Sequence, residues 1–296
     1  MTIDMTQWKE LTMEEHKQRA LQILVEVAEY CEANDIRYFL AYGTLIGAVR
    51  HKGFIPWDDD IDIQMPRPDY ERFAREFNKS VHTHNLRAVV PTDPDAKHTF
   101  VKVCDMDTLK IEDSLKYEGE KYLGVDVDVF PLDGLFEDTE EYKKRFRLKR
   151  KLAFKYLMIQ YRLYTKDLKF NGIGILKFVK RLGMVVVGRV CGAVSGKWKR
   201  EYLLDQMQKL ETEVPYETAV MVGMNCCTPD ALFDDCHRKI CYDSYTYAKF
   251  EDYSFRIPAG YDEIMRKQYG DYMTPPPAAQ QITHHANRVF EKRNVQ

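Results

Sequence analysis

The sequence predicts an α/β (α+β) fold that carries a basic helical insertion, and three observations support this. The 296 residues are 45% hydrophobic and 30% charged, as in a soluble globular protein. Over the first 130 residues, patterns typical of helices alternate with patterns typical of strands. Residues 143–200 hold eighteen Lys or Arg against a single acid, and apolar residues recur there at helical spacing.

The N-terminal third supplies the alternating elements. Thr12 and Glu15 form a capping box, and apolar side chains then recur on one face, which predicts a helix over 13–34. An aromatic strand over 38–42 ends at Gly43. Next we expect the start of a helix over 44–50, a strand over 57–65 and, after a proline break, a helix over 70–77. Four more strands are predicted over 86–90, 99–103, 109–112 and 125–130.

A formal charge of −2 conceals a strong separation of charge. Eighteen basic residues against one acid give residues 143–200 a charge of +17, and 26 basic against 45 acidic residues give the rest −19. Within the basic segment, 149–164 and 173–194 have the spacing of basic amphipathic helices. A solvated basic face is the ordinary explanation, but so long a segment with one acid favours an anionic partner. We expect an anionic membrane surface and no nucleic acid, since no base-reading helix or stacking motif is recognisable.

Further sequence features indicate where in the cell the protein is located. Lys and Arg within 173–194 argue against a spanning helix, and the opening MTIDMTQWKE lacks the pattern of a secretory signal. We therefore expect a cytoplasmic protein, peripheral at the inner face of the membrane. Its seven cysteines are an odd number, and we expect them to be reduced. The acidic C-terminal part is predicted to form a helix over 261–269, a proline loop over 275–277 and a short closing helix.

Four aspartates crowd into five positions, at Asp58, Asp59, Asp60 and Asp62. On an extended strand the three even-numbered carboxylates share one face. Such neighbours raise one another's pKa unless a divalent cation lies between them, and Mg²⁺, or Mn²⁺, suits a site built from oxygen ligands. An exposed acidic turn is the ordinary alternative.

Two further features favour the metal site over the acidic turn. Residues 125–129 repeat the alternation, so Asp128 can join the cluster from a neighbouring strand. Just upstream of the acids, Gly43 and Thr44 open a helix, where backbone N–H groups could hold a phosphate. The sequence thus predicts a site at which phosphate, metal and carboxylates meet.

GTLIGAVR at 43–50 and IPWDDDIDI at 55–63 resemble the signature of the LicD family of phosphocholine transferases, nucleotidyltransferase-fold enzymes related to fukutin-type proteins. Further similar blocks are FVK at 100–102, DVDVFPLDG at 126–134, IP at 257–258, YGDYM at 269–273 and PP at 275–276. The resemblance implies a nucleotidyltransferase-like mixed sheet flanked by helices. It also implies transfer of phosphocholine from CDP-choline, or a related CDP-linked donor, to a hydroxyl of a surface glycan, with release of CMP.

The resemblance also suggests how the chain is divided. We expect a nucleotidyltransferase-like catalytic core over 1–140, the basic amphipathic helical insertion over 141–212, and a segment over 213–296 that completes the catalytic domain. The implied acceptor is a glycan precursor of the teichoic acid, lipopolysaccharide or capsule type, which we expect to be lipid-linked.

In this comparison Asp60, Asp62 and Asp128 hold Mg²⁺, which agrees with the residue pattern. Asp58 is a further ligand or the base that takes the proton of the acceptor hydroxyl, whereas Asp59 points away and forms structural hydrogen bonds. Asp126 occupies a position that is commonly apolar in the family, so its role stays open.

Several residues near the acids are candidates for substrate binding. Gly43 and Thr44 would contact phosphate, and Arg50 and Lys102 are candidate countercharges for the diphosphate, with surface solvation as their alternative. Trp57 could form a cation–π wall for the quaternary ammonium of choline, or pack in the core.

Two groups late in the chain carry weaker signals. His284 and His285 follow the proline loop, and either could approach the active site or serve as a helix-start or core residue. A dense group of potential zinc ligands lacks the usual two-residue gap between its paired cysteines: Cys226, Cys227, Cys236, His237 and Cys241.

Three other functions remain open at this point. Relatives of the LicD type transfer other groups, such as ribitol phosphate. Glycosyltransferases also combine Asp-x-Asp with Mg²⁺ or Mn²⁺, but they release a nucleoside diphosphate, and the Gly43–Thr44 turn favours the phosphotransferase. A non-enzymatic membrane adaptor would use the basic helices and leave the spaced carboxylates without a role.

Overall fold

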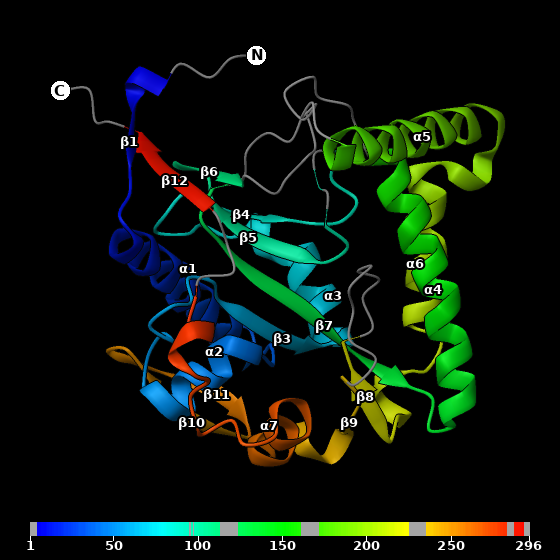
Figure 1. The fold of residues 1–296 in the computed structure, drawn as a ribbon. Coiled ribbons are helices and arrows are strands. Elements are labelled where there is room, and N and C mark those ends of the chain that lie inside the picture. The colour runs from blue at the N-terminus through cyan, green and yellow to red at the C-terminus, as the bar shows by residue number, and fades with distance from the viewer. Residues whose placement is uncertain are drawn as a thin grey trace.

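The computed structural model describes residues 5–94, 96, 98–112, 124–160, 172–224, 235–282 and 287–292. The strands of its central sheet are β2 (Phe39–Leu40), β3 (Asp62–Pro66), β4 (Leu86–Val89), β5 (Val101–Asp105), β7 (Asp126–Leu135), β8 (Met221–Gly223) and β9 (His237–Arg238). Five of them lie in the order β2-β3-β7-β5-β4, and β8 pairs with β7 and β9 (Figure 1). β3 and β7 are parallel, whereas the other neighbours in this sheet are antiparallel. The predicted α/β class with a mixed sheet is confirmed.

Two helices, α1 (Met13–Ala33) and α3 (Arg67–Glu76), pack against the central strands. α1 begins as predicted, because the Thr12 hydroxyl accepts from the Glu15 N–H at 3.2 Å and the Glu15 carboxylate accepts from the Thr12 N–H at 2.8 Å. Their apolar side chains join those of β3, β5 and β7 in one buried core, which includes Leu24, Val27, Phe73, Ile63, Val103, Val127 and Val129.

A smaller sheet and a hairpin complete the body of the fold. The three-stranded sheet has the order β1 (Trp8–Glu10), β12 (Asn287–Lys292) and β6 (Thr108–Glu112), and β10 (Tyr245–Phe250) pairs with β11 (Tyr253–Pro258). The short closing helix that we predicted after the proline loop is present only as a 3₁₀ turn over Ala278–Gln280, and the strand β12 that follows was not predicted. β12 is a strand because it hydrogen-bonds to β1 on one side and β6 on the other, and this placement buries Val289 and Phe290. The predicted helix over 261–269 is confirmed as α7 (Tyr261–Tyr269).

The basic segment forms a helical arm made of α4 (Thr139–Gln160), α5 (Gly172–Val194) and α6 (Arg200–Glu211). α4 and α6 lie side by side, and Ala153, Tyr156, Leu203 and Met207 are buried between them. α5 crosses the end of this pair, at the upper right of Figure 1. Both predicted basic helices are therefore present, and the first begins ten residues earlier than predicted. The domain boundaries stay a prediction.

A buried ion-pair network joins the helical arm to the sheet. Arg67, at the start of α3, donates to both carboxylate oxygens of Asp133 on β7, at 2.5 and 2.9 Å. The same guanidinium reaches Glu211, the last residue of α6, at 3.3 Å. Side chains of all three residues are at most 11% exposed. Removal of one partner would therefore leave a charge buried without compensation.

We expect Asp133→Ala to lower the free energy of unfolding by about 3–5 kcal/mol, because it leaves the Arg67 guanidinium buried without its main partner. Glu263→Ala is the matched control, since it removes a carboxylate that pairs with Arg238 on the surface and should cost at most about 1 kcal/mol. Urea unfolding followed by circular dichroism measures both. Similar losses in the two variants would contradict the role of the buried network.

Candidate active site

The parallel strand pair at the centre of the sheet places two acids side by side. Asp62, the first residue of β3, pairs with Asp128 of β7, and Lys102 of β5 pairs with Asp128 from the other side. Directly paired residues of neighbouring strands point to the same face of a sheet. The next residues, Ile63 and Val129, point to the opposite face and are buried in the core. The structure therefore brings Asp62 and Asp128 together, and their role as metal ligands stays a prediction.

The other predicted acids do not lie on an extended strand. Asp58, Asp59 and Asp60 form an irregular segment after a turn, in which the Asp58 N–H donates to the Ile55 carbonyl at 3.0 Å. Regular pairing begins only at Asp62, where β7 first lies alongside. The prediction that the even-numbered acids share one strand face is therefore wrong.

Three of the other carboxylates nevertheless act on Asp62. Burial raises the pKa of Asp62 well above its usual range, and the charges of Asp60, Asp128 and Asp58 raise it further. Asp58 lies directly against the predicted phosphate turn, since a Cβ atom on Gly43 would come within 2.6 Å of its Oδ2. Only glycine therefore allows this carboxylate to approach the backbone so closely.

Two lysines face the acids from the strands. The buried Lys102 ammonium lies 2.5 Å from both Asp126 Oδ2 and Asp128 Oδ1, and Lys110 Nζ lies 2.6 Å from Asp126 Oδ1. Burial lowers the pKa of Lys102, but the charges of Asp126 and Asp128 outweigh burial and raise it. Burial raises the pKa of Asp128 to about 7, although the charge of Lys102 opposes the rise. Asp126 thus holds two ammonium groups, a role that the sequence left open.

The acid cluster fits a divalent cation in charge and in donor type. Burial is the main cause of the raised pKa of Asp62, and the charges of Asp60, Asp128 and Asp58 add to it, so a bound cation would stabilise the ionised carboxylate. Carboxylate oxygens are also the preferred ligands of Mg²⁺. In the part of the chain that the structure describes, no three His, Cys, Asp or Glu side chains are already gathered around one metal position. The ammonium of Lys102 lies against Asp128 there.

The predicted phosphate turn is tied to β3. Gly43 and Thr44 lie within α2 (Tyr42–Ile46), a short helix that continues as a π-helical turn over Gly47–His51. The buried Thr44 hydroxyl accepts from the Asp62 N–H at 2.9 Å, so the turn and the first acid of the strand are held together. The hydroxyl can still donate its own proton.

Arg50 and Trp57 both precede the acids in the sequence. The Arg50 guanidinium donates to the Tyr272 carbonyl at 2.6 Å and thereby holds the segment after α7. Burial lowers the pKa of Arg50. The ring of Trp57 is half-buried, packs against the core and meets the His51 ring edge-on. Contacts of either residue with substrate stay predictions.

A buried network that the sequence did not indicate supports the phosphate turn. Tyr42, directly before Gly43, has a φ of 45°, a left-handed conformation that is strained for an aromatic residue. Its hydroxyl donates to Asp235 at 2.7 Å and accepts from Gln64 of β3 at 2.9 Å. Burial by itself would raise the pKa of Asp235, but hydrogen bonds from His237 and Tyr42 outweigh burial and lower it. Because Asp235 is 193 residues away along the chain, no local pattern could have revealed this contact.

The histidine pair and the potential zinc ligands that the sequence suggested near the C-terminus are, taken together, only partly described by the structure. His284, His285, Cys226 and Cys227 lie outside the described residues. His237, one of the potential zinc ligands, contacts Asp235 instead, with 2.9 Å between Nε2 and Oδ1.

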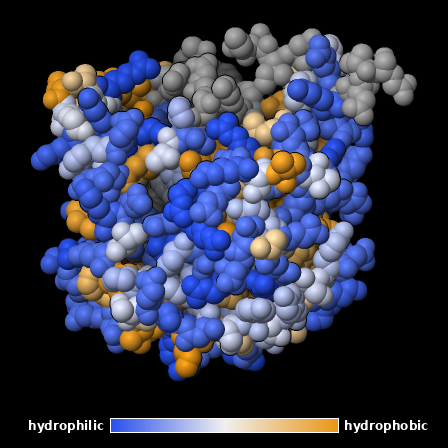
Figure 2. Space-filling model, turned by 180° about the vertical axis from the view of Figure 1, so that it is seen from behind, coloured by the Kyte–Doolittle hydropathy of each residue, from blue (hydrophilic) through white to orange (hydrophobic). Residues whose placement is uncertain are grey.

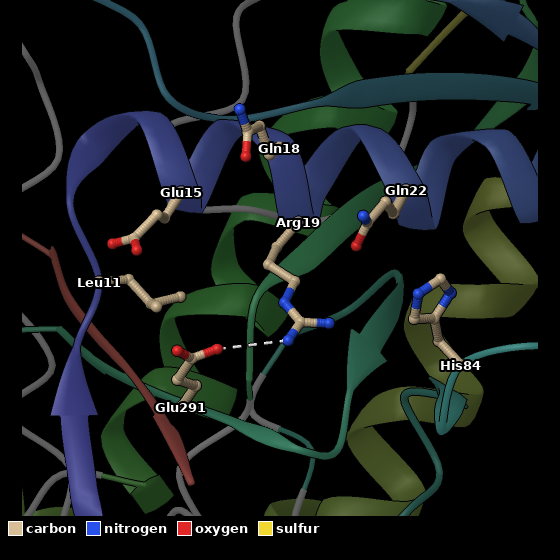
Figure 3. A pocket seen from close by; sticks show the side chains of 7 residues that line it. All are labelled: Leu11, Glu15, Gln18, Arg19, Gln22, His84 and Glu291. Atoms are coloured by element: carbon tan, nitrogen blue, oxygen red, sulfur yellow. Dashed lines mark hydrogen bonds and ion pairs between the residues drawn. The ribbon is translucent and has the colours of Figure 1, made fainter. Parts of the chain in front are cut away.

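A polar pocket of about 300 Å³ lies beside the N-terminal half of α1. Figure 3 shows Gln18, Arg19 and Gln22 of α1 together with His84 and Glu291, and Arg19 pairs with Glu291 at 3.3 Å. None of the residues predicted for the active site lines this pocket. It is therefore separate from the acid cluster.

Comparison with known proteins gives a consistent assignment. Residues 35–173 match the family model described as LicD/FKTN/FKRP, nucleotidyltransferase domain. The lipopolysaccharide cholinephosphotransferase LicD of Haemophilus influenzae is 27% identical over 288 residues, which cover 95% of this chain and 99% of that protein.

Two shorter matches each cover less than half of this chain. The ribitol 5-phosphate transferase FKRP of Homo sapiens is 47% identical over 47 residues, 14% of this chain and 10% of that protein. Mannosyltransferase regulator 4 of Saccharomyces cerevisiae is 26% identical over 118 residues, 40% of this chain and 10% of that protein.

We expect His16 to limit stability in acid. This buried α1 residue lies 3.7 Å from Asp59, and burial, followed by the charge of Lys110, lowers its pKa from 6.5 to about 4. Between these pH values the unfolded chain takes up a proton that the folded protein refuses, so about 3 kcal/mol of stability is lost as pH falls from 6.5 to 4.

Unfolding measured across this pH range tests the expectation on the wild type and His16→Gln. The free energy of unfolding of the variant should fall less steeply with decreasing pH, because its unfolding takes up one proton fewer. An unchanged pH dependence would mean that His16 does not stay neutral in the folded state.

Proposed function

Because the chain belongs to the LicD family of nucleotidyltransferase-fold phosphotransferases, we propose that it transfers phosphocholine from CDP-choline to a hydroxyl of a cell-surface glycan precursor. The observation that carries this proposal is the similarity to a lipopolysaccharide cholinephosphotransferase along nearly the whole chain. The geometry supports it, since Asp62, Asp128 and the Gly43–Thr44 turn are held together by one strand pair.

In the proposed reaction the acceptor oxygen forms a bond to the phosphorus of the phosphocholine group, and the bond from that phosphorus to CMP breaks. Asp58, which lies against the turn, takes the proton of the acceptor hydroxyl. Backbone N–H groups at Gly43 and the Thr44 hydroxyl contact the phosphates. Arg50 and Lys102 supply positive charge for the diphosphate.

Asp60, Asp62 and Asp128 would hold a Mg²⁺ ion, with Mn²⁺ as the alternative. When bound, the ion offsets negative charge on the diphosphate and on the departing CMP. The surroundings of Asp62 support this part of the proposal, because burial first and then the charges of Asp60, Asp128 and Asp58 raise its pKa, and a cation bound there would oppose all of these effects.

We further propose that the acceptor is a lipid-linked precursor of the teichoic acid, lipopolysaccharide or capsule type, modified at the inner face of the membrane. The charge of +17 on residues 143–200 supports peripheral attachment to an anionic surface. Among the described helices, none combines the length and the apolar character needed to cross a membrane.

Transfer of another phospho-alditol group is the second candidate, and the short match to a ribitol 5-phosphate transferase favours it specifically. The comparisons favour both phosphotransferase reactions over a glycosyltransferase or a membrane adaptor. Incubation with CDP-choline, CDP-ribitol or nucleotide sugars, each with an acceptor glycan, distinguishes these functions. CMP released with CDP-choline supports the proposal, whereas release of a nucleoside diphosphate from a sugar donor would overturn it.

We expect Asp60→Asn and Asp62→Asn each to lower turnover with CDP-choline at least about a hundredfold, because stabilisation of the transferring phosphoryl group depends on the charged carboxylates. The matched control is Asp252→Asn, an exposed carboxylate in the turn between β10 and β11. Steady-state CMP release at saturating Mg²⁺ measures the effect. Turnover near that of the wild type in either variant would contradict the assignment.

Asp128→Ala should weaken Mg²⁺-dependent binding of CDP-choline more than Asp126→Ala does, because Asp128 lies beside Asp62 whereas Asp126 holds Lys102 and Lys110. Titration calorimetry with and without Mg²⁺ compares the two variants. Equal losses, or a larger loss for Asp126→Ala, would contradict the choice of Asp128 as the metal ligand on β7.

A further inference from the structure

α5 exposes a continuous apolar face. Eight large aliphatic residues of this helix are each at least 39% exposed, up to 78% for Val194: Ile175, Leu176, Val179, Leu182, Val186, Val187, Val190 and Val194. They recur at intervals of three, four and seven residues and therefore lie on one side of the helix. An apolar face of this kind on a soluble protein marks an interaction surface.

This exposed face is not the side by which α5 packs on the rest of the protein. Val185, on the opposite side, is buried, and a Cβ atom on Gly188 would come within 2.5 Å of the Met158 carbonyl oxygen of α4. The close approach at Gly188 fixes α5 against α4 and leaves the other side facing outward. In Figure 2, which views the molecule from behind, orange side chains accordingly gather at the upper left, where α5 lies.

Positive charge borders the apolar face on both edges. Lys180 follows Leu176 by one helical turn on one edge, and Arg189 follows Val186 on the other. Both are exposed, and neither forms an ion pair with a carboxylate of the described residues. α5 itself contains no Asp or Glu.

We propose that this face of α5 docks on an anionic lipid bilayer, with the helix in the plane of the interface, its aliphatic side chains among the acyl chains and Lys180 and Arg189 at the headgroups. Such a helix has the features of an interfacial anchor, namely one apolar face bordered by basic residues. The inference rests on the proposed function only in that a lipid-linked acceptor would lie at the same surface.

Two other occupants satisfy the observations less well. A second copy packed face to face would bring Lys180 and Arg189 close to their symmetry mates, and like charges oppose such contact. An anionic polymer would satisfy the charges but leave eight aliphatic side chains in water. Only a lipid surface accounts for both the charge and the apolar face.

Cosedimentation with vesicles tests the proposal, with phosphatidylglycerol mixed into phosphatidylcholine across a series of salt concentrations. The apolar variant is Val179→Ser/Val186→Ser/Val190→Ser, because serine and valine have similar helix propensities and the replaced side chains are exposed. Val81→Ser/Val220→Ser is the matched control, since both valines are exposed elsewhere in the fold. Lys180→Gln/Arg189→Gln removes the flanking charge. Circular dichroism establishes that each variant is folded.

We expect the wild type and the valine control to bind vesicles that contain phosphatidylglycerol. The apolar variant should lose at least tenfold in partitioning at low and at high salt, and the charge variant should lose binding mainly at low salt. Wild-type failure to bind at low salt, or wild-type binding by the apolar variant, would overturn the proposal. So would a concentration-dependent dimer, seen by light scattering, that the apolar variant abolishes.

The vesicle measurement needs no substrate, so its outcome is independent of the proposed reaction. If phosphocholine reaches a short soluble acceptor while vesicle binding fails, only the docking surface is wrong. If vesicle binding succeeds while CDP-choline yields no CMP with any acceptor, only the proposed reaction is wrong.

Discussion

The close approach of carboxylates at the start of β3 is the constraint on which the rest of the site depends. Asp62 and Asp128 are fixed as direct neighbours by the register of two parallel strands, and neither can move away without breaking that register. Their repulsion must therefore be offset by cations. Lys102 supplies one positive charge from the antiparallel neighbour β5, but burial and the charges of Asp60, Asp128 and Asp58 together outweigh it and raise the pKa of Asp62. A site so arranged favours a further cation.

The fold maintains this unfavourable arrangement through its other face. Ile63, Val127 and Val129 alternate with the acids and are buried beneath α1 and α3, so the apolar core holds the strands in the register that crowds the carboxylates. Close approach of Gly43 to Asp58 and the hydrogen bond between Thr44 and Asp62 then attach the phosphate turn to the same strand. Hydrophobic packing on one face of the sheet thus offsets the repulsion among the carboxylates on the other face.

How far the sequence could be interpreted depended on the range of each interaction. α1 and α7 were predicted closely, because capping and helical periodicity are local. The aspartates at 58–60 were placed on a strand wrongly, since the start of β3 is set by its pairing with β7 and not by its own alternation. β12 was not predicted, because its partners β1 and β6 are distant in sequence. The contact between Tyr42 and Asp235 was missed for the same reason.

Separation of charge along the chain gives the molecule a preferred orientation at an anionic surface. Residues 143–200 carry +17, whereas the rest of the chain, which contains the acid cluster, carries −19. An anionic surface attracts the first and repels the second, within a screening distance of about 8 Å at physiological ionic strength. Arg67 links the two parts, because it bonds Asp133 of β7, the strand of Asp128, and Glu211 of the arm. Docking through α5 would therefore orient the acid cluster as well, and transfer to an acceptor hydroxyl benefits from such a defined approach.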